Sequence, residues 1–185
     1  MNQITQLAPE FQVSQWLNSK QPIALTALRG RVVVLHAFQM LCPGCVTHGL
    51  PQATAIRRSF AESEVAVIGL HSVFEHHDVM GAAALEAFVD EYRLEFPIGI
   101  DHPAANSNIP LTMQAYRLRG TPSLILIDRS GMIRFHHFGR LDDLMVGGLI
   151  GQLVAGTSTK QTTGDVAPAG VSEHLACNEN GCMIA

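Results

Sequence analysis

The chain has 185 residues, of which 47% are hydrophobic and 15% charged, and its formal net charge is −4. This composition favours one folded domain with extensions and argues against global disorder. The charge gives no electrostatic reason to expect binding to nucleic acid or to anionic lipid, and no apolar run reaches the roughly 18 residues that a membrane span needs. The first ten residues lack the basic and apolar regions of a secretory signal, so we expect a cytoplasmic protein.

The first half of the chain predicts two buried strands joined by a helix. After an extended N-terminal segment, residues 31–38 form an apolar run rich in β-branched side chains, which is typical of a strand buried on both faces. A helix is expected over about residues 44–61, with a kink at Pro51, which removes one hydrogen bond of the helical ladder. Residues 64–71 predict a second buried strand, parallel to the first because a helix connects them.

The second half predicts shorter elements and a tail. We expect a helix over residues 82–94, a strand over 96–101, a helix over 111–116, two antiparallel strands over 120–128 and 132–138, and a last helix from Asp142 to about residue 155. The predicted fold is thus α/β, with a central mixed sheet flanked by helices in one domain over residues 1–155. Residues 156–170 have the composition of a flexible linker, and residues 171–185 form a tail that carries two further cysteines.

The motif Cys42-Pro43-Gly44-Cys45 follows directly after the first buried strand and opens the first helix. Unpaired N–H groups and the positive end of the helix dipole stabilise a thiolate at such a position, and a thiolate is the reactive form of cysteine. The second sulfur lies one turn further on, close enough to form a disulfide. The alternative is half of a zinc site, but the other cysteines are distant and spaced C-x4-C. A redox centre is therefore favoured.

The order of elements and several motifs together resemble the thioredoxin superfamily, most closely its redoxin branch of TlpA-like and AhpC/TSA-like proteins. The motifs span about residues 8–155 and are Ala8-Pro9-Glu10-Phe11, Cys42-Pro43-Gly44-Cys45, Phe96-Pro97 with Asp101, Gly120-Thr121-Pro122, and Asp128-x-x-Gly131. This resemblance implies a thioredoxin-like fold with a cis-proline at Pro122, next to Thr121, facing the cysteines. It also implies a thiol–disulfide oxidoreductase that needs no cofactor or metal and exchanges electrons with protein thiols or disulfides and a cellular dithiol reductant.

The resemblance assigns roles to individual residues. Cys42 is expected to be the exposed, low-pKa nucleophile, and Cys45 to resolve the mixed disulfide that Cys42 forms. Pro43 and Gly44 between them help to set the redox potential. His36 occupies the buried strand position where thioredoxins often keep an acidic residue, so it either accepts the proton of Cys45 or is a core histidine bonded to backbone.

The tail pair, Cys177 and Cys182, has two interpretations. A flexible linker places this second dithiol where it can visit the first, as an internal electron shuttle or resolving pair, and Asn180-Gly181 favours a turn that brings its sulfurs together. The alternative is an incidental mobile tail. The sequence does not indicate an oligomeric state.

Two other functions remain open at this stage. One is a thiol-dependent peroxidase, an antioxidant in which Cys42 passes through a sulfenic acid, although the P-x-x-x-T-x-x-C motif of peroxiredoxins is absent around Cys42. The other is a metal carrier that uses the dithiol with a histidine. His76 and His77 are more typical of a solvated loop, and the adjacent His136 and His137 point to opposite faces of a strand, so neither pair is a strong ligand set. His71, at the end of a strand, is the histidine expected nearest to the active-site face.

Overall fold

The computed structural model describes residues 6–156 and 181–183 of the chain. Its strands are β1 (Gln6–Leu7), β2 (Val13–Leu17), β3 (Val32–Phe38), β4 (Val65–His71), β5 (Ile98–Asp101), β6 (Gly120–Thr121), β7 (Ser123–Ile127), β8 (Met132–Phe138) and β9 (Cys182–Met183). The α-helices are α1 (Leu50–Ser59), α2 (Ala82–Glu91), α3 (Leu111–Ala115) and α4 (Asp143–Val154), with a π-helix at Cys45–Gly49 and short 3₁₀ helices at Leu25–Leu28 and His77–Val79. Within these described ranges, no helix is long and apolar enough to cross a membrane.

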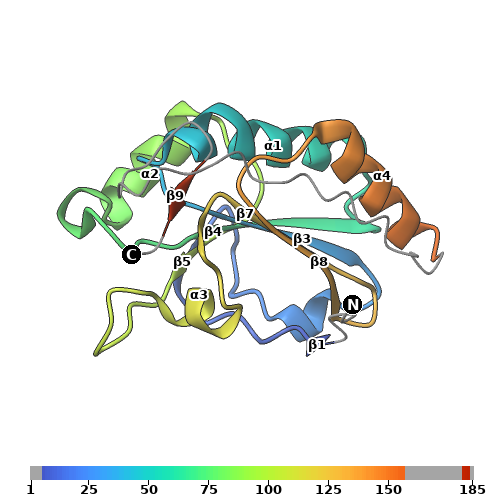
Figure 1. Ribbon diagram of the computed structural model, residues 1–185, viewed down its shortest axis with the longest axis horizontal. Coiled ribbons are helices and arrows are strands. Elements are labelled where there is room, and N and C mark those ends of the chain that lie inside the picture. Colours follow the sequence, from blue (N-terminus) through green and yellow to red (C-terminus); the bar gives the residue numbers. More distant parts are fainter. Residues whose placement is uncertain (1–5, 157–180, 184–185) are drawn as a thin grey trace, which may run out of the picture.

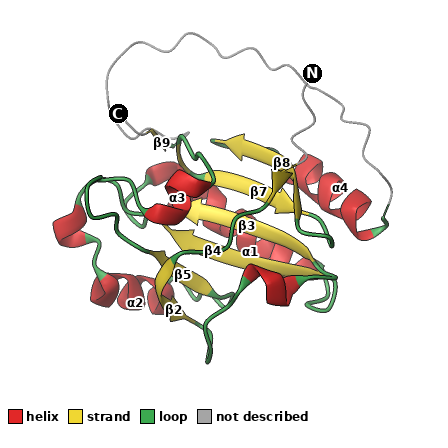
Figure 2. Ribbon diagram, turned by 90° about the horizontal axis from the view of Figure 1, so that it is seen from below, coloured by secondary structure: helices red, strands yellow, loops and turns green. Residues whose placement is uncertain are grey.

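Seven strands form one mixed sheet in the order β1-β8-β7-β3-β4-β5-β2, and β6 pairs with β9 in a separate two-stranded sheet. Strands β3 and β4 are parallel, as their helical connection predicted, and β5 is parallel to β4. Strand β7 is antiparallel to both of its neighbours, β3 and β8. Every residue of β3, β4 and β7 is buried. Helices α1 and α4 lie on one face of the sheet and α3 on the other (Figures 1 and 2). This is the thioredoxin-like arrangement, and it places the end of β3 at the middle of the sheet.

The predicted helix after β3 is confirmed, because helical structure is continuous from Pro43 to Ser59 and α1 is its second part. A π-turn over Cys45–Gly49 interrupts the regular α-helical bonding, and the Leu50 N–H donates to the Cys45 carbonyl, five residues back. Pro51 lies directly after this π-turn, in the first turn of α1. The irregularity therefore lies in the turn before Pro51, where the kink was predicted, and next to the cysteines.

The Asp101 side chain connects β5 to α3 and to the loop that follows β4. Its Oδ1 accepts the Thr112 N–H at 2.8 Å, and its Oδ2 accepts the Met113 N–H at 3.0 Å and the Ser72 hydroxyl at 2.9 Å. Burial raises the pKa of Asp101, while these donors act against that rise. The side chain therefore caps α3 from a distance in sequence and ties it to the loop that follows β4.

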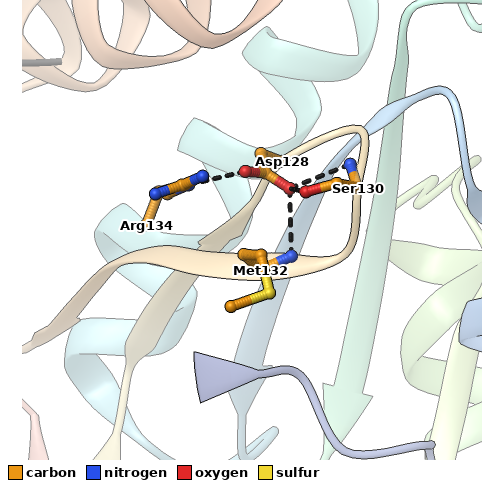
Figure 3. A network of polar contacts seen from close by, with 4 residues as sticks. All are labelled: Asp128, Ser130, Met132 and Arg134. Atoms are coloured by element: carbon orange, nitrogen blue, oxygen red, sulfur yellow. Dashed lines mark hydrogen bonds and ion pairs between the residues drawn. The ribbon is translucent and has the colours of Figure 1, made fainter. Parts of the chain in front are cut away.

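The turn between β7 and β8 is organised by Asp128, as Figure 3 shows. Its Oδ1 accepts the Ser130 hydroxyl at 2.6 Å, the Ser130 N–H at 2.9 Å and the Met132 N–H at 3.0 Å, while Oδ2 pairs with Arg134. Gly131 has φ of +84°, a conformation that glycine adopts without steric cost. The predicted antiparallel pairing of these two strands is confirmed, and these contacts explain why aspartate and glycine occupy the two ends of the turn between them.

The predicted cap of the last helix is also confirmed. The Asp142 side chain accepts the N–H groups of Leu144 and Met145 at 3.0 and 3.1 Å. Gln52 in α1 donates to the Leu141 carbonyl at 2.9 Å and to Asp143 Oδ1 at 2.7 Å. These bonds fix the start of α4 against the helix that follows the cysteine motif. The linker predicted after it lies, apart from Gly156, outside the described residues.

Candidate active site

Cys42 is the residue from which the helix after β3 starts. Its N–H donates to the Gln39 carbonyl at 3.2 Å, and its own carbonyl accepts the Cys45 N–H at 3.0 Å. The Cys42 sulfur also accepts the Cys45 N–H, at 3.3 Å, which is the bond that an N-cap side chain makes. Helical structure begins at Pro43, the position where a proline is best tolerated. The predicted placement of the first cysteine at a helix N-terminus is thus observed.

The two residues between the cysteines differ in their surroundings. Pro43 is exposed and Gly44 is buried. The Pro43 carbonyl accepts the Thr47 hydroxyl at 2.8 Å. Gly44 has φ of −62°, a right-handed helical value that most residues adopt. Backbone strain is therefore not the reason for a glycine here, and its contribution to the redox potential stays a prediction.

The two sulfurs have opposite acid–base properties. The hydrogen bond from the Cys45 thiol is the largest influence on Cys42 and, against an opposing effect of burial, lowers the Cys42 pKa to about 7 from 9.0. Thr121 and the backbone N–H groups of Cys45 and Cys182 add to the lowering. Burial, together with the bond to Cys42 and its charge, raises the pKa of Cys45 well above 9.0. At neutral pH about half of the molecules therefore carry a thiolate at Cys42, while Cys45 keeps its proton.

The expectation that Cys42 is exposed is wrong for this structure. Cys42 and Cys45 are both free cysteines and both are fully buried. The Cys42 sulfur contacts the Thr121 carbonyl at 3.4 Å, and the Cys182 backbone hydrogen-bonds to it. The sequence could not show this cover because it comes from residues about 80 and 140 positions further along the chain.

The Thr121-Pro122 peptide bond is cis, as the family resemblance implied, and both residues are buried. Thr121 belongs to β6 and faces the cysteine motif with its carbonyl. Among the described residues its buried hydroxyl has no nitrogen or oxygen partner, but it lowers the pKa of both Cys42 and Cys45. The Thr121 hydroxyl therefore interacts with the two thiols.

His36 lies in β3 beneath the π-turn and is 2% exposed. A Cβ placed on Gly49 would lie 2.6 Å from His36 Cε1 and 3.2 Å from Pro122 Cβ, so the imidazole, the π-turn and the cis-proline are in close contact. Burial, and to a smaller extent His48, lowers the His36 pKa to about 4. The neutral imidazole is thus a weaker base than the sequence-based argument assumed, and the proton-relay role stays a prediction. Its Nδ1 has no partner in the described part of the chain.

The other histidines do not gather around the cysteines. His71 is buried, packs 5.3 Å from the Phe38 ring centroid and has no hydrogen-bond partner for either nitrogen within the described ranges. Burial lowers its pKa to about 4. His48 lies closer to the motif and hydrogen-bonds to the Leu141 carbonyl at 2.8 Å. Across residues 6–156 and 181–183, no three His, Cys, Asp or Glu side chains are placed to hold a metal ion.

Sequence reasoning missed Gln39 and Gly49. Gln39 is buried, accepts the Phe74 N–H at 3.2 Å through its side chain, and through its backbone lowers the pKa of Cys45. Its polarity in an otherwise apolar stretch just before the motif was the available signal. For Gly49, the available signal was a glycine within a predicted helix. Glycine is unfavourable there and often indicates that the backbone packs closely against another group.

Part of the tail does reach the site. Cys182 is buried and lies opposite Thr121 in the antiparallel pairing of β6 and β9. Figure 1 shows β9 as the short dark red strand in the left part of the view, below the helices. Cys177, the other cysteine of the predicted pair, lies outside the described residues.

Comparisons with known proteins agree on the type of domain. The AhpC/TSA family model matches residues 4–136. Protein DipZ of Mycobacterium tuberculosis is 31% identical over 151 residues, which are 80% of this chain and 20% of DipZ. The thiol-disulfide oxidoreductase ResA of Halalkalibacterium halodurans is 30% identical over 126 residues, 68% of this chain and 64% of ResA. The chain thus spans about a fifth of the length of the DipZ proteins that it matches.

Solved structures share the fold. A thiol-disulfide isomerase from Corynebacterium glutamicum is 53% identical, with a TM-score of 0.77 over 80% of this chain and 97% of that one. A crystal structure of a thioredoxin-like superfamily protein is 50% identical, with a TM-score of 0.78 over 87% of this chain and 98% of that one. A thioredoxin-like protein solved in its oxidised form is 20% identical with a TM-score of 0.70. The predicted thioredoxin-like fold is confirmed.

Proposed function

Because the chain belongs to the AhpC/TSA family, in the redoxin branch of the thioredoxin superfamily, we propose that it is a thiol–disulfide oxidoreductase whose Cys42 and Cys45 cycle between dithiol and disulfide. The observation that carries this proposal is the opposite displacement of the two pKa values within one helical turn. A pair with one ionised and one protonated sulfur is what two successive exchange steps require.

The first step is an attack on a partner disulfide. The Cys42 thiolate forms a bond to one partner sulfur, the partner S–S bond breaks, and the second partner sulfur leaves as a thiolate that takes up a proton. The product is a mixed disulfide between Cys42 and the partner. The helix N-terminus and the Cys45 thiol make this step possible at neutral pH, because they hold a substantial part of Cys42 as thiolate.

The second step resolves the mixed disulfide. Cys45 gives its proton to water and attacks the Cys42 sulfur, the bond between Cys42 and the partner breaks, and the partner sulfur leaves as a thiolate that takes up a proton. In total, two electrons pass to the partner and the Cys42–Cys45 disulfide forms. The charge of Cys42 is one cause of the high Cys45 pKa, and a mixed disulfide carries no charge there. The Cys45 pKa therefore falls when its thiolate is needed.

Protein disulfides and thiols are the substrate class that we propose, with a cellular dithiol that reduces the Cys42–Cys45 disulfide again. Support comes from the similarity to ResA and to the Corynebacterium glutamicum isomerase, whose names carry this chemistry. The proposed reaction needs no cofactor, since both electrons come from sulfur.

Reduction of insulin disulfides with dithiothreitol as electron source tests this function. We expect turnover above the uncatalysed rate for the wild-type protein and none for C42S. The matched variant C45S should also fail to turn over but should accumulate a mixed disulfide on Cys42. Equal activity of C42S and wild type would contradict the proposal. Rapid, saturable loss of hydrogen peroxide without insulin reduction would instead favour the peroxidase alternative.

A further inference from the structure

The second cysteine of the tail lies inside the site that the proposed function uses. Strand β9 pairs antiparallel with β6, with Cys182 opposite Thr121 and Met183 opposite Gly120. Thr121 is the residue whose carbonyl contacts the Cys42 sulfur. The register of this short ladder therefore places the Cys182 backbone directly beside Cys42.

Two glycines make this close approach possible. A Cβ on Gly120 would lie 2.0 Å from the Cys182 carbonyl oxygen, and a Cβ on Gly181 would lie 2.5 Å from the Thr121 carbonyl oxygen. Gly181 also has φ of +147°, which side-chain-bearing residues rarely adopt. A side chain at Gly120 in β6, or at Gly181 just before β9, would thus collide with the backbone of the facing strand. The close pairing of β6 and β9 depends on both glycines.

The contact reaches the reactive sulfur itself. The Cys182 backbone N–H hydrogen-bonds to Cys42 and is one of the groups that lower its pKa. Cys182 is 1% exposed and Cys42 is fully buried. The Cys182 sulfur is disulfide-bonded in this structure and is only a few covalent bonds from that N–H, so a cysteine disulfide lies next to the reactive thiol. An external partner, in contrast, has no access to Cys42 in this arrangement, because the side chain is fully buried.

We propose that Cys182 is an internal exchange partner of Cys42, so that the tail cysteines pass electrons to and from the Cys42–Cys45 pair. The inference rests on the proposed function and deepens it by naming one partner of that site. Tethering gives Cys182 a high effective concentration at Cys42, and the β6–β9 ladder fixes its position as an extended peptide is fixed at a sheet edge.

The exchange balances with the sulfurs of this chain alone. When Cys182 is in a disulfide with Cys177, the Cys42 thiolate attacks the Cys182 sulfur, that S–S bond breaks, and Cys177 leaves as a thiolate and is protonated. Cys45 then gives its proton to water and attacks the Cys42 sulfur, the Cys42–Cys182 bond breaks, and Cys182 leaves as a thiolate that takes up a proton. Two electrons have moved from the Cys42–Cys45 pair to the tail. The reverse sequence lets a reduced tail restore the dithiol.

Trapping in the full-length C45S variant tests the relay. Without the resolving sulfur, we expect a Cys42–Cys182 disulfide as the main product after mild oxidation, identified by peptide mass spectrometry. Its apparent first-order rate constant should not depend on protein concentration. C45S/C182S is the control and should not form a disulfide between Cys42 and position 182. An apparent rate constant that rises in proportion to protein concentration would overturn the internal route.

Gly181→Ala tests the docking without removing a sulfur. It should reduce Cys42–Cys182 formation in the C45S background and should make Cys42 react faster with iodoacetamide, each by about tenfold, because undocking removes both proximity and cover. Gly147→Ala is the matched control, since a Cβ there has nothing within 4 Å, and should leave both rates unchanged.

Two outcomes separate this inference from the proposed function. If C45S forms a mixed disulfide with oxidised glutathione at Cys42 but never with Cys182, the relay fails and the oxidoreductase proposal survives. If C45S reacts with neither, both fail. A third result also overturns the relay: C182S raises the alkylation rate of Cys42, while insulin reduction by the Cys42–Cys45 pair stays as fast as in wild type. Strand β9 would then be a cover only.

Discussion

Replacement of Cys45 by alanine should raise the pKa of Cys42. The Cys45 thiol is the largest of the groups that lower this pKa, which lies at about 7 against an ordinary value of 9.0. Alanine removes that donor but leaves the helix N-terminus, Thr121 and the backbone N–H groups in place. We therefore expect a Cys42 pKa of about 8 in C45A, part of the way back to the ordinary value.

The consequence for reactivity follows from the thiolate fraction. A pKa near 7 leaves about half of Cys42 ionised at pH 7, and a pKa near 8 leaves about a tenth. Since the thiolate is the nucleophile, alkylation of Cys42 by iodoacetamide at pH 7 should be about fivefold slower in C45A than in wild type. The assay is the rate of mass-detected alkylation at pH 5 to 10, which gives the pKa as the midpoint.

C45S is the matched control for this prediction. Serine keeps a hydroxyl donor of similar size at the same place, so its Cys42 pKa should stay close to the wild-type value. The reasoning is refuted if C45A and C45S have the same midpoint as wild type, because the second sulfur would then not support the first. It is equally refuted if the Cys42 pKa rises by the same amount in C45A and C45S, because the size of the thiol rather than its hydrogen bond would then be responsible.

Three further predictions concern the surroundings of the site. Gly49→Ala should lower the free energy of unfolding by about 1–3 kcal/mol in urea titrations, because its Cβ would lie 2.6 Å from His36. Gly147→Ala should instead raise it by about 0.5–1 kcal/mol, since a Cβ there, inside α4, meets nothing within 4 Å. Asp101→Ala should lower it by about 2–4 kcal/mol, because three donors lose their acceptor; a loss below that of an exposed Asp→Ala variant would contradict this. His36 and His71, whose pKa values fall from 6.5 to about 4 on folding, should make the protein less stable as pH falls from 6.5 to 4, since the unfolded chain binds the protons there. His71→Phe should flatten that dependence, and an unchanged slope would contradict it.

The fold was predictable because its signals are local. The β-branched runs now seen as β3 and β4, the Asp128–Gly131 turn and the cap at Asp142 each depend on residues that are neighbours in the sequence. Strand β2 was predicted only as an extended segment. It becomes a strand by pairing with β5 about 85 residues later, and no local pattern encodes such a partner.

The site was predictable in its residues but not in its environment. The C-x-x-C motif at a strand–helix junction identified Cys42 and Cys45, and the family resemblance implied the cis-proline at Pro122. The burial of Cys42 and the low pKa of His36 depend on segments that meet only in three dimensions. The docking of Cys182 on Thr121 depends on glycines at positions 120 and 181, whose purpose appears only when both backbones are in place.

A redox titration of the full-length protein, with rapid thiol trapping and peptide mass spectrometry, tests the central claim most directly. The account predicts that Cys42 and Cys45 are oxidised together as one two-electron couple, and that Cys42 is the first sulfur alkylated at pH 7 in the reduced protein. If both sulfurs stay reduced over the whole range of potentials, or if Cys42 resists alkylation when Cys182 has been replaced by serine, the cysteine pair is not the redox centre described here.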